Sequence, residues 1–187
     1  MKKKITIEFF LFFLLFFFLI SITIFQGLKQ DYTSIIDFDL TVIHNSLQLV
    51  SNEFPDFQDL TSYSHFLTYG IFYKIFSFFD DSLITNIELL SNNKNPELIL
   101  KKLYVVSRIA NATIHFVALV YFYKILKLFN TDKINRILIL IFLVISETFI
   151  ANFIILRTDI VAVCYFLISF FYLLDFVKNN KILNLFI

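Results

Sequence analysis

The apolar stretch at residues 137–177 constrains the fold of this chain more than any other feature. As one continuous helix it would be roughly 60 Å long, about twice the hydrocarbon thickness of a bilayer. We therefore expect it to fold back on itself and to form two membrane-spanning helices. Arg157, Thr158 and Asp159 form a polar cluster near its middle, which predicts the position of the turn.

Two further apolar stretches, residues 5–25 and 103–123, each have the length of one membrane crossing, roughly 31 Å as a helix. The chain becomes apolar again between Lys181 and Ile187, which we interpret as the start of a truncated fifth span. Hydrophobic residues make up 58% of the chain, well above the average for soluble proteins. The sequence thus predicts an all-α membrane protein, a multi-span helical bundle with a large extracytoplasmic first loop that contains amphipathic helices.

The basic residues predict the orientation in the membrane. In short segments they gather on one side of the predicted spans, within residues 2–4, 124–136 and 178–181. Because positive charge marks the cytoplasmic side, we expect a cytoplasmic N-terminus. The first apolar run is long for a signal peptide and no small-x-small cleavage site follows Phe25, which favours an uncleaved helix. Abundant Phe, Ile, Leu, Asn and Lys are typical of an AT-rich bacterial genome, so the expected location is a bacterial inner membrane.

Three regions follow from this topology. Residues 1–25 contain the cytoplasmic start and the first span, residues 26–102 an extracytoplasmic loop, and residues 103–187 spans two to four and the start of the fifth. The loop carries ten acidic residues and five lysines. Its negative charge argues against nucleic acid as a partner. Within it, the aromatic run at residues 66–79 is too short to cross a bilayer and predicts an interfacial helix.

The first half of the loop holds the acidic residues of most interest. Apolar residues recur at helical spacing between Asp37 and Val50, which predicts an amphipathic helix with His44 on its polar face. Asp37 and Asp39 stand at the start of this helix. Two roles suit them equally: capping of the helix, or acid-base chemistry at the membrane surface. We interpret His44, and more so His65 and His115, as solvated or interfacial histidines.

Four further polar residues lie near or within the predicted spans. Arg157 and Asp159 flank the predicted outer turn. Two roles suit them equally well: they could stabilise the ends of the two helices, or Arg157 could help to bind a phosphate at the membrane surface. Arg108 and Glu147 lie in apolar segments, where a charged group faces a partner or a cavity. For these two, pairing within the protein is slightly favoured over substrate contact, and Arg108 is placed to extend outward toward the headgroups.

The sequence contains no nucleotide-binding loop, nucleophile elbow or metal-ligand spacing, which argues against soluble nucleotide-dependent chemistry. Cys164 is the single cysteine and lies in an apolar run. We therefore expect Cys164 to be a small buried residue that packs against apolar neighbours.

The order of several short motifs resembles a known family. A basic start and one span precede an outer loop that begins with acids at residues 37–44. An aromatic stretch at residues 63–70 comes next, then Ser-Arg-Ile-Ala at residues 107–110 and Leu-Arg-Thr-Asp-Ile at residues 156–160. In this order the chain resembles the N-terminal part of a GT-C type integral membrane glycosyltransferase. That group includes the dolichyl-phosphate-mannose protein mannosyltransferases and the aminoarabinose transferases of lipid A.

The resemblance implies transfer of a sugar from a polyprenyl-phosphate donor to an acceptor at the extracytoplasmic face. The acceptor would belong to an envelope glycan, a lipopolysaccharide or a protein. The resemblance places the family's general base on Asp39 first and Asp37 second. The acids are adjacent in the family, whereas Phe38 separates them here, so the match between the two remains open. Arg157, with Arg108, would neutralise the donor phosphate, while His44, Asp159 and Glu147 would line the site. The sequence leaves open whether a divalent metal takes part.

A second interpretation is a fragment of a multi-span transporter or of a lipid-linked oligosaccharide flippase. Glu147 and Arg108 would then line a pathway through the membrane, and the outer loop would be a passive cover. The size of the loop argues against this class, since transporters tend to have short loops between early spans.

Overall fold

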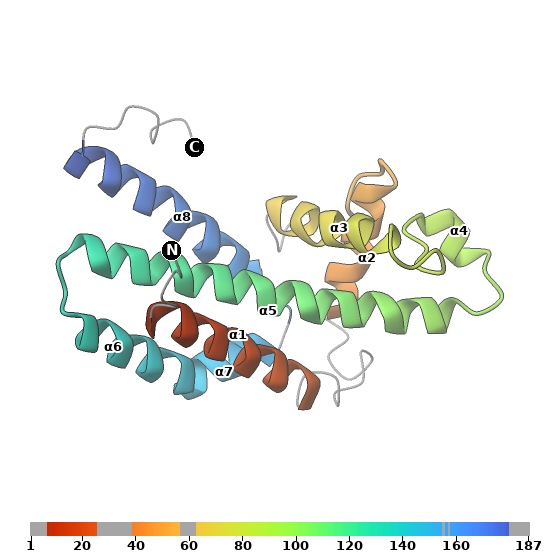
Figure 1. The fold of residues 1–187 in the computed structure, drawn as a ribbon. Coiled ribbons are helices and arrows are strands. Elements are labelled where there is room, and N and C mark those ends of the chain that lie inside the picture. Colours follow the sequence, from red (N-terminus) through yellow and green to blue (C-terminus); the bar gives the residue numbers. More distant parts are fainter. Residues whose placement is uncertain (1–6, 26–38, 57–62, 155, 157, 180–187) are drawn as a thin grey trace, which may run out of the picture.

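The computed structural model describes the chain apart from residues 1–6, 26–38, 57–62, 155, 157 and 180–187. Every regular element within the described residues is a helix, which confirms the all-helical prediction (Figure 1). In the described part of the chain, three helices are long and apolar enough to cross a membrane: α1 (Ile7–Phe25), α5 (Pro96–Leu128) and α8 (Thr158–Asn179). They correspond to the predicted first, second and fourth spans.

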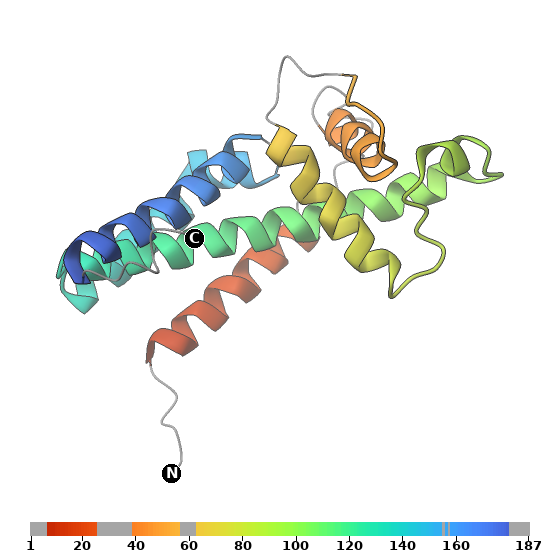
Figure 2. The same ribbon diagram turned by 90° about the horizontal axis from the view of Figure 1, so that it is seen from above.

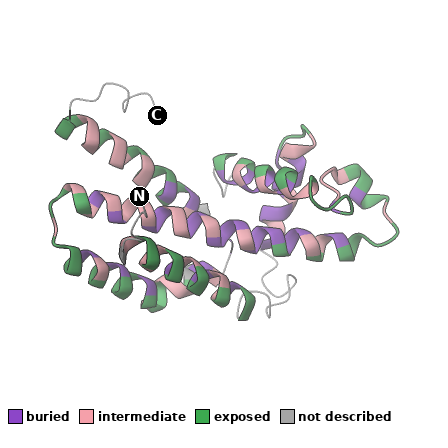
Figure 3. Cartoon of the chain, in the orientation of Figure 1, coloured by how far each residue is buried: buried purple, intermediate pink, exposed green. Residues whose placement is uncertain are grey.

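Helix α5 is the centre of the molecule. In the most apolar 18-residue segment of each helix, 67% of the residues of α5 are buried, compared with 17% for α1 and 11% for α8. Figure 3 shows the same contrast, with buried positions along α5 and exposed ones along α1 and α6. The apolar side chains that α1 leaves exposed, such as Phe9 and Phe17, suit a lipid environment. The core therefore forms around α5, with α1 on one side and α3 and α8 on another.

Helix α5 is also longer than the predicted second span. It begins at Pro96, where a missing backbone N–H costs nothing, and ends before Asn130, which has a φ of 54°. Its 33 residues are about 50 Å long, so its first turns extend beyond a bilayer core of about 30 Å. Residues 96–102, which were expected to belong to the outer loop, are thus the first two turns of this helix.

The third predicted span is interrupted, which corrects the expectation of one continuous helix. Helix α6 (Lys133–Ile145) ends before Ser146, whose backbone is extended with φ −66° and ψ 139°, and α7 (Glu147–Ile154) follows. The Ser146 hydroxyl accepts a hydrogen bond from the backbone N–H of Phe149 at 3.3 Å, and Glu147 is an acid in the first turn. A serine cap and a first-turn acid both stabilise a helix start, so this local sequence begins a new helix.

The predicted outer turn lies slightly earlier than expected. Helix α7 ends at Ile154 and α8 begins at Thr158, so Thr158 and Asp159 belong to the first turn of α8. Arg157 lies outside the described residues. Cys164 on α8 is buried, as its apolar surroundings predicted.

The segment between α1 and α5 contains α2 (Thr41–Val50), α3 (Tyr63–Ser77) and the short α4 (Ile87–Ser91). Helices α2 and α3 pack closely, and α3 crosses α5 (Figure 2). Gly70 makes the close approach possible, because a Cβ atom there would lie 2.6 Å from Val50 Cγ2 and 3.2 Å from the Ser46 carbonyl oxygen. The predicted helix at residues 66–79 is therefore confirmed as a helix, with one face packed against the protein.

Five basic residues lie on the parts of α5, α6 and α8 at the opposite end of the bundle: Lys124, Lys127, Lys133, Arg136 and Lys178. There Lys178 Nζ donates to the Leu128 carbonyl oxygen at 2.7 Å, which joins the end of α8 to the end of α5. Tyr123 Oη donates to Glu8 Oε1 at 2.9 Å, and Arg136 Nη2 lies 3.9 Å from the same carboxylate oxygen. The single charge of the first span is thus paired. This end of the molecule thus lies opposite the end that carries α2, α3 and α4 (Figure 1).

Candidate functional site

Asp39 lies at the centre of a buried polar site just before α2. Its side chain is 1% exposed and forms an ion pair with Arg108, whose Nη2 donates to Asp39 Oδ2. The other carboxylate oxygen, Oδ1, accepts a hydrogen bond from the backbone N–H of Leu156 at 2.9 Å. The carboxylate thus joins three segments that are far apart in the sequence: the start of α2, the middle of α5 and the connection between α7 and α8.

These contacts decide one question that the sequence left open. The N-cap position of α2 is Leu40, and no side chain caps this helix. The carboxylate of Asp39 points instead toward α5 and the start of α8. Capping of its own helix is therefore not the role of Asp39 in this structure. Asp37 lies outside the described residues.

Arg108 is buried rather than extended toward the membrane surface, which corrects the expectation from sequence. Its side chain is 2% exposed, Nη2 also donates to Tyr104 Oη at 2.8 Å, and the guanidinium lies 4.7 Å from the centre of the Tyr104 ring. Its Nε and Nη1 atoms have no hydrogen-bond partner among the described residues. Buried N–H groups without partners are costly, so these donors are suited to a further acceptor.

A layer of polar side chains surrounds this ion pair. Tyr73 Oη lies 2.6 Å from Ser107 Oγ, and Tyr69 Oη donates to Asn111 Oδ1 at 3.2 Å. Asn111 Nδ2 donates in turn to the Phe153 carbonyl oxygen at 2.7 Å, close to the end of α7. The network therefore connects α3, α5 and α7 at the level of Asp39 and Arg108.

Sequence reasoning did not assign a role to this layer. Its signal was present, since Tyr104, Ser107, Arg108 and Asn111 recur at spacings of three and four residues and so share one face of α5. Tyr69 and Tyr73 are also four residues apart on α3. A polar stripe on a helix that is otherwise apolar indicates a buried partner.

Burial shapes the protonation of these groups. It raises the pKa of Asp39, while the charge of Arg108 and the hydrogen bonds from Leu156 and Arg108 act in the opposite direction. Burial also raises the pKa of Tyr69 and Tyr73, so both phenols stay protonated at neutral pH. The site thus combines a carboxylate of increased basicity with neutral hydroxyl groups.

His65 is fully buried, which corrects its interpretation as a solvated histidine. Neither ring nitrogen has a hydrogen-bond partner among the described residues, and burial lowers its pKa to about 4. The imidazole packs against the ring of Tyr69 at 4.9 Å between centres. His115 is also buried, with Nδ1 at 2.9 Å from the Asn111 carbonyl oxygen. Both are core histidines.

The other predicted site residues lie elsewhere. His44 is partly exposed, and its Nε2 lies 3.1 Å from Asp56 Oδ2, a hydrogen bond that is the main cause of the lowered pKa of Asp56. Glu147 is exposed at the start of α7, and Asp159 is exposed in the first turn of α8. The structure thus brings together Asp39, Arg108 and the backbone of Leu156, the residue before Arg157. His44 pairs with Asp56 instead.

The described residues contain no group of three or more His, Cys, Asp or Glu side chains with the spacing of a metal site. Comparisons with protein families, characterised proteins and solved structures found no match. The geometry of the site is therefore the basis for a functional proposal.

Proposed function

We propose that this chain is part of a GT-C type membrane glycosyltransferase, which transfers a sugar from a polyprenyl-phosphate donor to an acceptor at the extracytoplasmic face. One observation carries the proposal. Asp39, the candidate base, lies in direct contact with Arg108 and with the backbone amide that precedes Arg157. Asp39 and Arg108, two of the residues to which the family resemblance gives roles, therefore come from distant segments and lie in direct contact.

Asp39 would act as the general base. The acceptor hydroxyl attacks the anomeric carbon of the sugar while its proton passes to the Asp39 carboxylate. The bond between that carbon and the phosphate oxygen breaks in the same step, and its electron pair leaves with the polyprenyl phosphate. A single displacement of this kind inverts the configuration at the anomeric carbon. The raised pKa of Asp39 suits this role, because a more basic carboxylate accepts the proton more readily.

Arg108 would stabilise the departing phosphate. In the structure the Nη2 atom of its guanidinium donates to Asp39, while Nε and Nη1 are buried and have no hydrogen-bond partner in the described parts of the chain. A donor phosphate would satisfy these N–H groups and compete with Asp39 for the positive charge. We therefore propose that donor binding exchanges the partner of Arg108 and frees Asp39 to accept a proton. Arg157, next to Leu156, would contribute the second positive charge.

The proposal extends to the setting of the reaction. The enzyme would be a multi-pass protein of a bacterial inner membrane with a cytoplasmic N-terminus. Its acceptor would be a lipid or a protein of the cell envelope, with an envelope glycan or lipopolysaccharide as the product. The apolar surfaces of α1 and α8 support contact with membrane lipids.

The transporter alternative gains no support from the described residues. It required Arg108 and Glu147 to line a pathway, but the charge of Arg108 is paired with Asp39 and Glu147 lies exposed at the start of α7. A buried ion pair of this kind neutralises a charge within the bundle.

The test is sugar transfer by Asp39→Asn and Asp37→Asn variants of the full-length protein, reconstituted with a polyprenyl-phosphate sugar. We expect Asp39→Asn to lower turnover by about 10²- to 10⁴-fold, the usual contribution of a general base. Asp56→Asn is the matched control, an acid of the segment between α1 and α5 that is exposed and paired with His44, and it should retain wild-type turnover. Wild-type turnover in both Asp39→Asn and Asp37→Asn would show that neither acid is the base.

A further inference from the structure

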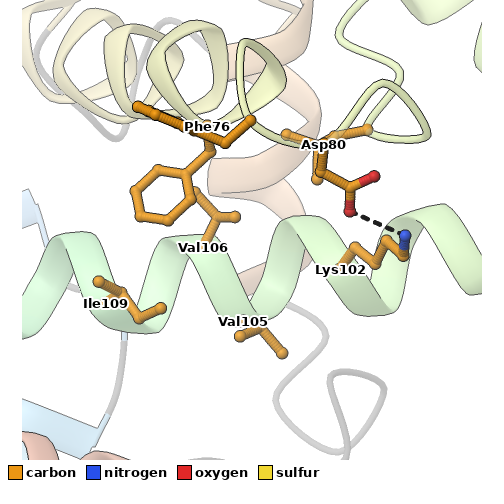
Figure 4. Close-up of a pocket in the computed structure, with 8 residues that line it drawn as sticks. Phe76, Asp80, Lys102, Val105, Val106 and Ile109 are labelled. Atoms are coloured by element: carbon orange, nitrogen blue, oxygen red, sulfur yellow. Dashed lines mark hydrogen bonds and ion pairs between the residues drawn. The ribbon is translucent and has the colours of Figure 1, made fainter.

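A groove lies between the C-terminal end of α3 and the first half of α5, and none of the residues that line it belongs to the Asp39 site. It has a volume of about 240 Å³. Figure 4 shows the side chains that line it, among them Phe76, Asp80, Lys102, Val105, Val106 and Ile109. Most of these are apolar, so the groove offers little to a soluble polar ligand.

The polarity of the groove changes along α5. At one end Lys102 Nζ lies 2.8 Å from Asp80 Oδ2, and at the other end lies Ile109 (Figure 4). Ile109 lies seven positions after Lys102 in the helix, which corresponds to about 10 Å along its axis. The groove thus has a charged end and an apolar end, like an amphipathic lipid.

The charged end lies at the depth of the lipid headgroups if α5 crosses a membrane. Between Lys102 and Lys124 the only charged residue of α5 is Arg108, which is paired with Asp39. This stretch, in which the Arg108 charge is paired with Asp39, is about 31 Å long and matches the hydrocarbon core. Lys102 therefore stands at its boundary, and Ile109 lies about 10 Å deeper, at the level of the hydrocarbon chains.

The ion pair still has hydrogen-bonding capacity on both sides. Lys102 donates to Asp80 and to Ser82 Oγ, which leaves one of its three N–H groups. Asp80 accepts from Lys102 and from the hydroxyl and backbone N–H of Ser82, which leaves about one of its four acceptor sites. Both side chains are partly exposed, at 37% and 47%. The hydrogen bonds from Lys102 and Ser82 lower the pKa of Asp80 to about 2, so it is ionised at neutral pH.

We propose that this groove binds one hydrocarbon chain of a zwitterionic phospholipid with a primary ammonium headgroup. The lipid phosphate contacts Lys102, the ammonium group contacts Asp80, and the chain packs against Val106 and Ile109. Charge complementarity selects this headgroup, because a pair with no net charge matches a headgroup with no net charge. A lipid with a net negative headgroup would place part of its charge beside the Asp80 carboxylate. This inference does not depend on the proposed transferase activity.

The test uses the absence of tryptophan from the chain. A Val105→Trp variant places one fluorophore in the groove, at a side chain that is 38% exposed. In mixed vesicles, phosphatidylethanolamine with brominated chains should quench this fluorescence with a relative binding constant about fivefold higher than brominated phosphatidylglycerol, as expected for one charge-assisted contact. Val163→Trp on α8, 46% exposed and outside the groove, is the matched control and should show no preference.

Addition of Asp80→Asn and Lys102→Gln to the Val105→Trp variant should abolish the preference. Equal quenching by the two lipids in Val105→Trp alone would overturn the proposal, as would a preference that survives both substitutions. An unlabelled polyprenyl phosphate serves as the competitor. If it displaced the brominated lipid more strongly than unlabelled phosphatidylethanolamine does, the groove would belong to the donor lipid and the proposal would be wrong.

Discussion

The buried ion pair between Asp39 and Arg108 makes a quantitative prediction about stability. In an Arg108→Gln variant, the Asp39 carboxylate stays 1% exposed and keeps the Leu156 N–H, but it loses its counter-ion. Removal of one partner from a buried pair costs about 3–5 kcal/mol of unfolding free energy. For a chain of this size, the melting temperature should fall by about 6–20 °C.

The double variant Asp39→Asn, Arg108→Gln separates two effects: loss of the contact itself, and the cost of a buried charge that has no counter-ion. Two amides replace the two charges, so no uncompensated charge remains in the core. We expect its stability to lie within about 2 kcal/mol of the wild type and above that of the Arg108→Gln single variant. The assay is thermal unfolding in detergent, followed by circular dichroism. Lys101→Gln removes a cation from an exposed pair with Glu97 and should leave the melting temperature unchanged.

The pH dependence gives a second readout of the same pair. Burial raises the pKa of Asp39 in the folded protein, and loss of Arg108 should raise it further. A raised folded-state pKa contributes stability that is fully present below the unfolded-state value of 3.8 and is lost as the pH rises through the folded-state pKa. The deficit of Arg108→Gln should therefore be smaller at about pH 4 than at about pH 8. The reasoning is refuted if Arg108→Gln melts with the wild type, or if the double variant melts no higher than the single one.

Two further predictions concern packing and topology. Gly70→Ala should destabilise the contact between α2 and α3 by about 1–3 kcal/mol, because the new Cβ meets Val50 Cγ2 at 2.6 Å. Val50→Ala in the same chain should restore part of this loss in a thermal melt, and an unchanged melting temperature in Gly70→Ala would contradict the close approach. In a background without Cys164, Asp56→Cys should react with an impermeant thiol reagent added outside the cell, and Asp132→Cys should react only after permeabilisation. The reverse pattern would invert the proposed orientation.

The long helices follow from the sequence because each depends on local information. Residues 5–25 and 103–123 are apolar over the length of a membrane crossing, and the structure places α1 and α5 there. The break at Ser146 also has a local sequence signal, a serine cap followed by Glu147. The sequence prediction missed this signal because the surrounding stretch is apolar over such a length. Apolar length thus predicts that a segment is buried in lipid or protein more reliably than it predicts where its helices end.

The candidate site depends on tertiary contacts that no local pattern contains. Asp39 and Arg108 were each notable in the sequence, but they are 69 residues apart and nothing near either residue predicts the other as its partner. The same holds for Tyr73 and Ser107, which are 34 residues apart. His65 shows the converse: its sequence neighbours include polar residues, whereas its actual surroundings are buried rings. The sequence thus identified Asp39 and Arg108 as candidate site residues, but only the three-dimensional structure shows that they are in contact.

Helix α5 carries one polar contact in its middle and another near its C-terminal end, and this limits which changes in chain length the protein tolerates. Arg108 contacts Asp39 in the middle of the helix, while Tyr123 contacts Glu8 near its C-terminal end. One residue inserted between them would turn the two contacts relative to each other by about 100° and separate them by a further 1.5 Å. Both contacts could not then be kept. Insertions and deletions should therefore be tolerated in the connections between helices and selected against between Arg108 and Tyr123.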